Sequence, residues 1–91
     1  MMNKKPFRID FSKKFNKQLK KAPLEIKKAF LKKLNFFNQN PFHPLLNNHA
    51  LRGELRGYRS INITGDLRAL YRQTKEKVLL EALGTHSELY E

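Results

Sequence analysis

The hydrophobic pattern of the first half of the chain predicts one strand and two amphipathic helices. Residues 7–11 alternate apolar and polar side chains, the period of a half-buried strand. Ser12 is a suitable N-cap for a helix whose apolar positions Phe15, Leu19 and Ala22 recur at helical spacing among lysines. Pro23 ends this helix and fits the first turn of another. The second helix has apolar positions at Ile26, Phe30, Leu34 and Phe37, and it ends at Asn40-Pro41.

The second half predicts a long loop followed by three strands. Residues 41–57 have no period and contain two prolines and two glycines, which indicates a loop that is either functional or a cover for the sheet edge. Residues 58–63 alternate, with Arg59 on the same face as two isoleucines, and Thr64-Gly65-Asp66 turns the chain into a second alternating run over 67–73. Residues 78–83 are nearly all apolar, as in a central strand, and Ser87 could cap one final helical turn.

This order, βααβββ, predicts a single α+β domain over residues 1–91. We expect an antiparallel sheet with the N-terminal helical hairpin packed on one face. Ninety-one residues leave no room for a second core.

Composition narrows the class of partner. Nineteen Lys and Arg against eight Asp and Glu give a formal charge of +11, which favours polyanionic partners. The absence of cysteine excludes disulfides and thiolate chemistry and suits a reducing cytoplasm. The first residues are basic without an apolar run behind them, so we expect neither a signal peptide nor a membrane span.

The charge is divided unequally. Residues 1–45 hold twelve basic and two acidic residues, a net of +10, whereas residues 46–91 hold seven and six, a net of +1. The first half is lysine-rich and the second arginine-rich. Because the planar guanidinium of Arg can bind a phosphate with two hydrogen bonds at once, the second half is the better place to expect a specific site.

Reactive side chains are few. No phosphate-binding glycine loop is present, and the three histidines have no metal-ligand spacing, so no metal or other cofactor is expected. His86 follows the last predicted strand, where it could either exchange a proton with a ligand or only end the strand.

The segment from His49 to Tyr90 resembles the RelE/ParE superfamily of bacterial toxins. The residues that carry the resemblance are HALRGELRGYRSINI, GD in the turn, LRALYR and the ending LGTHSELY. The last of these is most similar to the YafQ type of messenger-RNA interferase. The element order fits the RelE-like fold, so the similarity covers almost the whole chain.

The resemblance implies a metal-independent endoribonuclease that cleaves messenger RNA in the ribosomal A site. His49 and His86 match two catalytic histidines, base and acid in either order. Asp66 matches a catalytic aspartate, and Tyr90 matches a C-terminal aromatic that stacks on a base or bonds the phosphate. The implied RNA contacts are Arg59 and Arg68 at the scissile phosphate, with Arg52 and Arg72 further out.

Two positions depart from the YafQ pattern. Asn62 stands where that type has a third histidine, and Asn can hydrogen-bond RNA but cannot shuttle a proton. Leu67 stands where that type has Trp.

The family also implies a protein partner, an acidic antitoxin encoded next door that covers the basic surface. Two alternatives stay open: a ParE-like toxin that inhibits DNA gyrase without nuclease chemistry, and a catalytically impaired relative. Both would share the fold, so fold alone does not decide between them.

Overall fold

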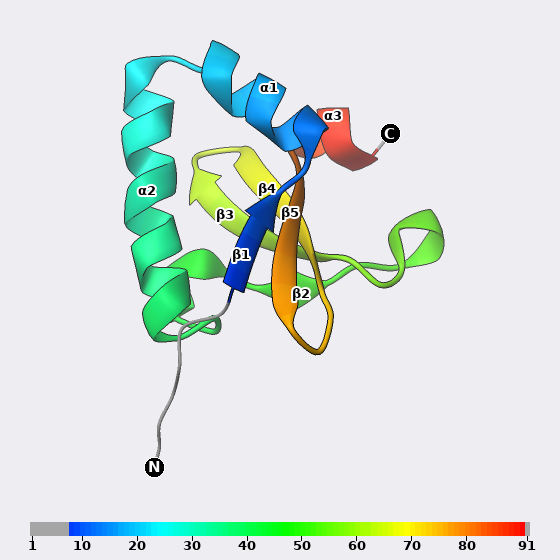
Figure 1. Cartoon of the computed structure of the whole chain (residues 1–91). Helices are drawn as coiled ribbons and strands as arrows, with labels where there is room; N and C mark the ends of the chain where they lie inside the picture. The colour runs from blue at the N-terminus through cyan, green and yellow to red at the C-terminus, as the bar shows by residue number, and fades with distance from the viewer. Residues whose placement is uncertain (1–7, 91) are drawn as a thin grey trace.

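The computed structural model describes residues 8–90 (Figure 1). Two short 3-10 turns, η1 (Pro44–Leu46) and η2 (Gly53–Leu55), interrupt the long loop that the sequence predicts. The helices are α1 (Lys13–Lys21), α2 (Leu24–Gln39) and α3 (His86–Tyr90). The strands are β1 (Arg8–Phe11), β2 (His49–Ala50), β3 (Arg59–Thr64), β4 (Leu67–Gln73) and β5 (Lys77–Thr85).

The helix ends follow local side-chain chemistry. The Ser12 hydroxyl accepts a hydrogen bond from the Phe15 N–H at 2.9 Å, so the predicted cap of α1 is confirmed. The cap predicted for the last helix is wrong, because Ser87 lies inside α3. Thr85 and Glu88 form a reciprocal pair instead: the Glu88 N–H donates to the Thr85 hydroxyl, and the Thr85 N–H donates to the Glu88 carboxylate.

The sheet is mixed, in the order β1-β5-β4-β3-β2. Three neighbouring pairs are antiparallel, but β1 runs parallel to β5, with Ile9 opposite Val78. The expectation of a wholly antiparallel sheet is therefore wrong at this one pair. Alternation in residues 7–11 specifies which side chains are buried, but it does not encode the direction of the partner strand.

The core lies between the sheet and the helical pair, on what we call the α1/α2 face. Phe15, Phe30 and Phe37 are almost wholly buried there against Ile61, Ile63 and Tyr71. The rings of Phe15 and Phe30 lie 5.3 Å apart, and Phe37 meets Tyr71 edge-on at 5.1 Å. The burial predicted from the helical spacing of Phe15, Phe30 and Phe37 is confirmed.

The opposite side of the sheet, the α3 face, carries the alternate strand residues. They include Ser60, Asn62, Arg68, Leu70, Ala82 and Gly84. Helix α3 folds back over Gly84, where an added Cβ would lie 3.0 Å from the Glu88 carboxylate, so glycine permits the close approach. The loop that carries η2 projects on the side of the molecule away from α2 (Figure 1).

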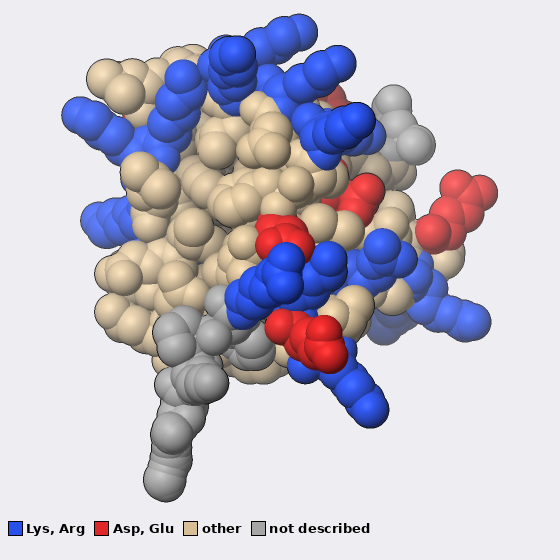
Figure 2. Space-filling model, in the orientation of Figure 1, with Lys and Arg blue, Asp and Glu red and all other residues tan. Residues whose placement is uncertain are grey.

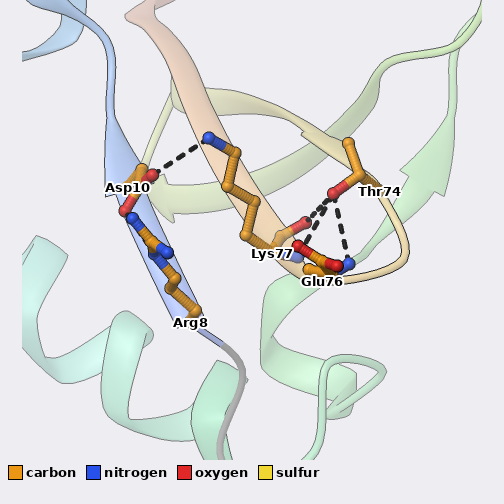
Figure 3. A network of polar contacts seen from close by, with 5 residues as sticks. All are labelled: Arg8, Asp10, Thr74, Glu76 and Lys77. Atoms are coloured by element: carbon orange, nitrogen blue, oxygen red, sulfur yellow. Dashed lines mark hydrogen bonds and ion pairs between the residues drawn. The ribbon is translucent and has the colours of Figure 1, made fainter.

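Charged side chains form one network at the β1–β5 edge (Figure 3). Asp10 accepts from Lys77 Nζ at 3.1 Å and from Arg8 Nε at 3.4 Å. The Lys77 hydrogen bond, aided by the Arg8 charge, lowers the pKa of the Asp10 carboxyl. The Thr74 hydroxyl accepts from the Glu76 and Lys77 N–H groups and so closes the adjoining turn.

Candidate catalytic and RNA-binding face

His49 reaches the α3 face because β2 pairs with β3. Its antiparallel register places it opposite Ser60, a residue of that face. The His49 Nδ1 atom lies 2.8 Å from the Asn47 carbonyl oxygen. Because a carbonyl can only accept, Nδ1 must carry the proton, and Nε2 of the neutral ring keeps its lone pair. The backbone thus prepares His49 to accept a proton at Nε2.

Asn62 and Arg68 stand side by side across β3 and β4. They are register partners, and Arg68 Nη1 donates to Asn62 Oδ1 at 3.0 Å. Asn62 is also the diagonal neighbour of His49, at about 7–8 Å between Cα atoms from cross-strand geometry. The Arg68 Nε atom is buried and has no hydrogen-bond partner among residues 8–90. A cation and a potential base therefore lie in adjacent cross-strand rows of the α3 face.

Helix α3 supplies two more of the expected side chains. His86 is exposed, and its ring meets Tyr90 edge-on at 4.3 Å between centroids, as spacing of four along a helix allows. The Tyr90 hydroxyl is buried without a hydrogen-bond partner in the described part of the chain. A free buried hydroxyl costs free energy unless a ligand pairs with it.

Asp66 lies in the β3–β4 turn, at the end of the sheet where α3 begins. Thr64 pairs with Leu67, and Leu67 pairs with Thr85, which directly precedes His86. Gly65 adopts a left-handed φ of 47° at this turn, a conformation that glycine takes without strain. The Asp66 carboxylate is exposed and makes no hydrogen bond or ion pair within residues 8–90.

Arg59 does not join this group. It pairs with Tyr71 on the α1/α2 face, and its Nε donates to Asn48 Oδ1 at 2.8 Å. Asn48 in turn donates to the Tyr71 hydroxyl at 2.7 Å and to the Pro41 carbonyl at 2.9 Å. The guanidinium of Arg59 also lies over the Phe42 ring at 5.3 Å. These contacts hold the Arg59 side chain against the loop before β2, and its contact with RNA stays a prediction.

The other two arginines expected to contact RNA have different surroundings. Arg72 is exposed at the far end of β4, with its guanidinium 5.6 Å from the Tyr58 ring. Arg52 lines a cavity of about 430 Å³ between the η2 loop and α3. The cavity residues are Leu51, Arg52, Glu54, Leu55, Leu89 and Tyr90.

Two residues were missed by the sequence reasoning. Asn48 fixes the loop beside His49 and lies outside both the periodic patterns and the matched motifs. Glu54 lines the cavity and lies within the matched stretch HALRGELRGYRSINI, but no role was assigned to it. The position of Asn48 directly before His49 is the only signal that could have singled it out.

The described residues give little support for other classes of site. Within residues 8–90, no three His, Cys, Asp or Glu side chains are grouped so that they could hold a metal ion. No helix in this range is long and apolar enough to cross a membrane.

The fold is that of small bacterial toxins. YafQ from E. coli strain BL21(DE3) superposes with a TM-score of 0.70 at 24% identity, over 93% of this chain and 99% of that one. A YoeB dimer structure from Staphylococcus aureus gives a TM-score of 0.75 at 19% identity, over 90% and 99% of the two chains.

The chain belongs to the YafQ family of bacterial toxins of type II toxin–antitoxin systems, whose family model matches residues 7–91. The E. coli DinJ–YafQ complex is also similar, with 26% identity over 93% of this chain and 99% of that one, and a TM-score of 0.67. Among curated proteins, no match is found.

Proposed function

We propose that this toxin is a metal-independent endoribonuclease that cleaves messenger RNA in the ribosomal A site and so inhibits translation. The observation that carries the proposal is the group of His49, Asn62 and Arg68 on the α3 face, beside the helix that bears His86 and Tyr90. Asn62 is the cross-strand partner of Arg68 and the diagonal neighbour of His49. Family membership supports the same assignment.

The reaction uses the RNA's own 2′-hydroxyl as the nucleophile. His49 Nε2 takes the 2′ proton while the 2′ oxygen attacks the adjacent phosphorus. The bond from phosphorus to the 5′ oxygen breaks, and His86 in its protonated form gives that oxygen a proton. The products are a 2′,3′-cyclic phosphate and a free 5′-hydroxyl.

The proposed roles of base and acid follow from the surroundings of the two histidines. Only His49 has its Nδ1 proton fixed by a backbone carbonyl, which leaves Nε2 as an acceptor. His86 is exposed at the start of α3, and the pairing of Leu67 with Thr85 brings it to the same end of the sheet as the turn that holds Asp66.

The cation of the proposed site is Arg68. Its guanidinium stabilises the charge that builds up on the phosphate oxygens, and Asn62 holds it in place through Nη1. Asn62 therefore acts as a positioning residue, although it cannot move a proton. Asp66 orients the protonated His86 or the RNA.

The lysine-rich helices give the general affinity for polyanions. Figure 2 shows Lys and Arg side chains gathered over α1 and the adjoining part of α2. Exposed lysines on α1 are Lys13, Lys14, Lys17, Lys20 and Lys21. Ribosomal RNA would bind such a surface in a salt-dependent way. An acidic antitoxin could cover it, in keeping with the DinJ–YafQ complex of the relative.

Primer extension on a translated transcript, after induction of the protein, tests the proposal. Cuts within codons are expected in the wild type and are lost in His86→Ala. His43→Ala is the matched control, because His43 stacks on Phe36 away from the site. Inhibited gyrase without transcript cuts would instead favour the ParE-like function, and a soluble protein with neither effect would favour an impaired relative.

A further inference from the structure

The cavity between the η2 loop and α3 is not used by the proposed bond-breaking step. Leu51 and Leu55 belong to the loop, and Leu89 and Tyr90 belong to the helix. Its volume of about 430 Å³ lies within the range of small-molecule pockets, roughly 300–1,000 Å³. The space is therefore large enough for one nucleobase.

The lining favours a flat, uncharged ring over a phosphate group. The leucine side chains and the Tyr90 ring provide apolar surface on both sides, which suits the faces of an unpaired base. Glu54 places a carboxylate at the same cavity as Arg52, so the two charges cancel and the lining has no net charge to attract a phosphate. The buried Tyr90 hydroxyl still lacks a hydrogen-bond partner within residues 8–90.

Two polar side chains of this cavity are available to read the edge of a base. In the described part of the chain, neither Arg52 nor Glu54 makes a side-chain hydrogen bond or an ion pair, and both are exposed. A carboxylate accepts from N–H groups, and an arginine donates to ring nitrogen and carbonyl acceptors. Guanine presents two neighbouring N–H donors, at N1 and N2, on one edge and the O6 and N7 acceptors on another.

We propose that this cavity binds one unpaired base of the messenger RNA and selects guanine through Glu54 and Arg52. The inference rests on the proposed ribonuclease function, since it assigns a specificity pocket to that site. The chain supports the connection, because Arg52 follows His49 by three residues and Tyr90 follows His86 by four. A base held here would fix the register of the RNA relative to the two histidines.

A cleavage map of Glu54→Gln tests the selection. Wild-type cuts are expected to be enriched in guanine at one position relative to the scissile bond, and Glu54→Gln should reduce the preference for guanine over uracil about tenfold. Glu76→Gln removes the same charge in the β4–β5 turn and should leave the map unchanged. Identical base distributions in the wild type and Glu54→Gln would overturn the pocket assignment.

A binding experiment separates failure of the pocket from failure of the nuclease. The probes are the fully 2′-O-methylated trinucleotides UGU and UUU, which lack the nucleophilic hydroxyl and so cannot be cut. We expect UGU to bind the full-length protein about tenfold more tightly than UUU. It should also shift the amide resonances of residues 51–55 and 89–90.

The Glu54→Gln variant should lose the difference between the two trinucleotides, and Glu76→Gln should keep it. Equal affinities in the wild type, or shifts confined to other residues, would refute the pocket even if the protein cuts RNA. Selective binding by a protein that makes no cuts would refute the proposed nuclease function and retain the pocket.

Discussion

The two faces of the sheet differ in how completely their polar and apolar groups are satisfied. On the α1/α2 face, buried aromatic rings pack in tilted and edge-to-face contacts, and the Tyr71 hydroxyl accepts a hydrogen bond from Asn48. The buried polar side-chain atoms without a partner in residues 8–90 are Ser60 Oγ, Arg68 Nε and Tyr90 OH, and all belong to the α3 face or to α3 itself. The α1/α2 face therefore contributes the buried apolar packing, and the α3 face keeps polar atoms without hydrogen-bond partners. Such atoms are expected where a ligand completes a site.

The largest expected effect on stability comes from the α1/α2 face. Phe15→Ala should lower the free energy of unfolding by about 3–5 kcal/mol, because it leaves a cavity among the rings of Phe11 and Phe30. Urea unfolding followed by circular dichroism measures this loss. Leu31→Ala, on the exposed side of α2, is the control and should change the value by no more than about 0.5 kcal/mol. Similar losses in the two variants would contradict the location of the core.

Substitutions on the α3 face should reduce RNA cleavage and leave the free energy of unfolding nearly unchanged. His49→Asn keeps an N–H near the position of Nδ1 for the Asn47 carbonyl but has no basic nitrogen, so cleavage should fall about 100-fold or more. Quantitative primer extension gives the rate, and urea unfolding should show a nearly unchanged free energy.

His43→Asn is the matched control for that experiment. The His43 Nδ1 atom accepts from the Leu45 N–H, a bond that an Asn oxygen can replace, and cleavage should be unchanged. Undiminished cleavage by His49→Asn would exclude His49 as the base.

Sequence predicted the fold well because its signals are local. Helical spacing alone predicts that Phe15, Phe30 and Phe37 are buried, and the hydroxyl of Ser12 alone predicts where α1 begins. Neither prediction needs information from residues far away in the chain. The parallel β1–β5 pair was missed because strand direction depends on how the whole chain closes. The predicted cap at Ser87 is wrong even though the signal for the true cap is local, because Thr85 and Glu88 have the spacing of a capping box.

The candidate site shows the same division between local pattern and global placement. Alternation puts Arg59 on the face of Ile61 and Ile63, which is the core side, whereas the resemblance assigned it to RNA. The hydrogen bond to Asn48 explains why a charged side chain lies there, and it depends on a loop whose path no periodicity describes. The RNA contacts of Arg68 and Asn62 stay predictions.

A smaller effect should distinguish the two arginines. Arg59→Ala breaks its bond to Asn48 and the contact with Phe42, so we expect a loss of about 1–2 kcal/mol in unfolding free energy. Cleavage should fall less than tenfold, because Asn48 directly precedes His49 and the loss of the Arg59 bond would hold His49 less firmly in place. Arg68→Ala is expected to show the reverse, with cleavage reduced about 100-fold and a smaller change in stability. An Arg59→Ala protein of wild-type stability that no longer cuts would place Arg59 among the RNA contacts.

The smallest expected effect concerns two carboxylates with different roles, Asp10 at the β1 edge and Asp66 in the turn. The pKa of Asp10 is lowered in the folded protein, so its ionised form contributes stability above the ordinary carboxyl pKa of 3.8. That contribution is lost as the pH falls through the lower, folded value. Asp10→Asn should therefore reduce Tm slightly at pH 7 and make the decline below pH 4 shallower, without altering cleavage. Because the network is partly exposed, 0.5 M NaCl should diminish the difference. A wild-type pH dependence in Asp10→Asn would show that the network of Figure 3 contributes nothing to acid stability.

Asp66→Asn should instead reduce cleavage and leave Tm at pH 7 nearly unchanged, since Asp66 has no ion pair within residues 8–90 to lose. A Tm loss larger than that of Asp10→Asn would contradict this difference between the two carboxylates.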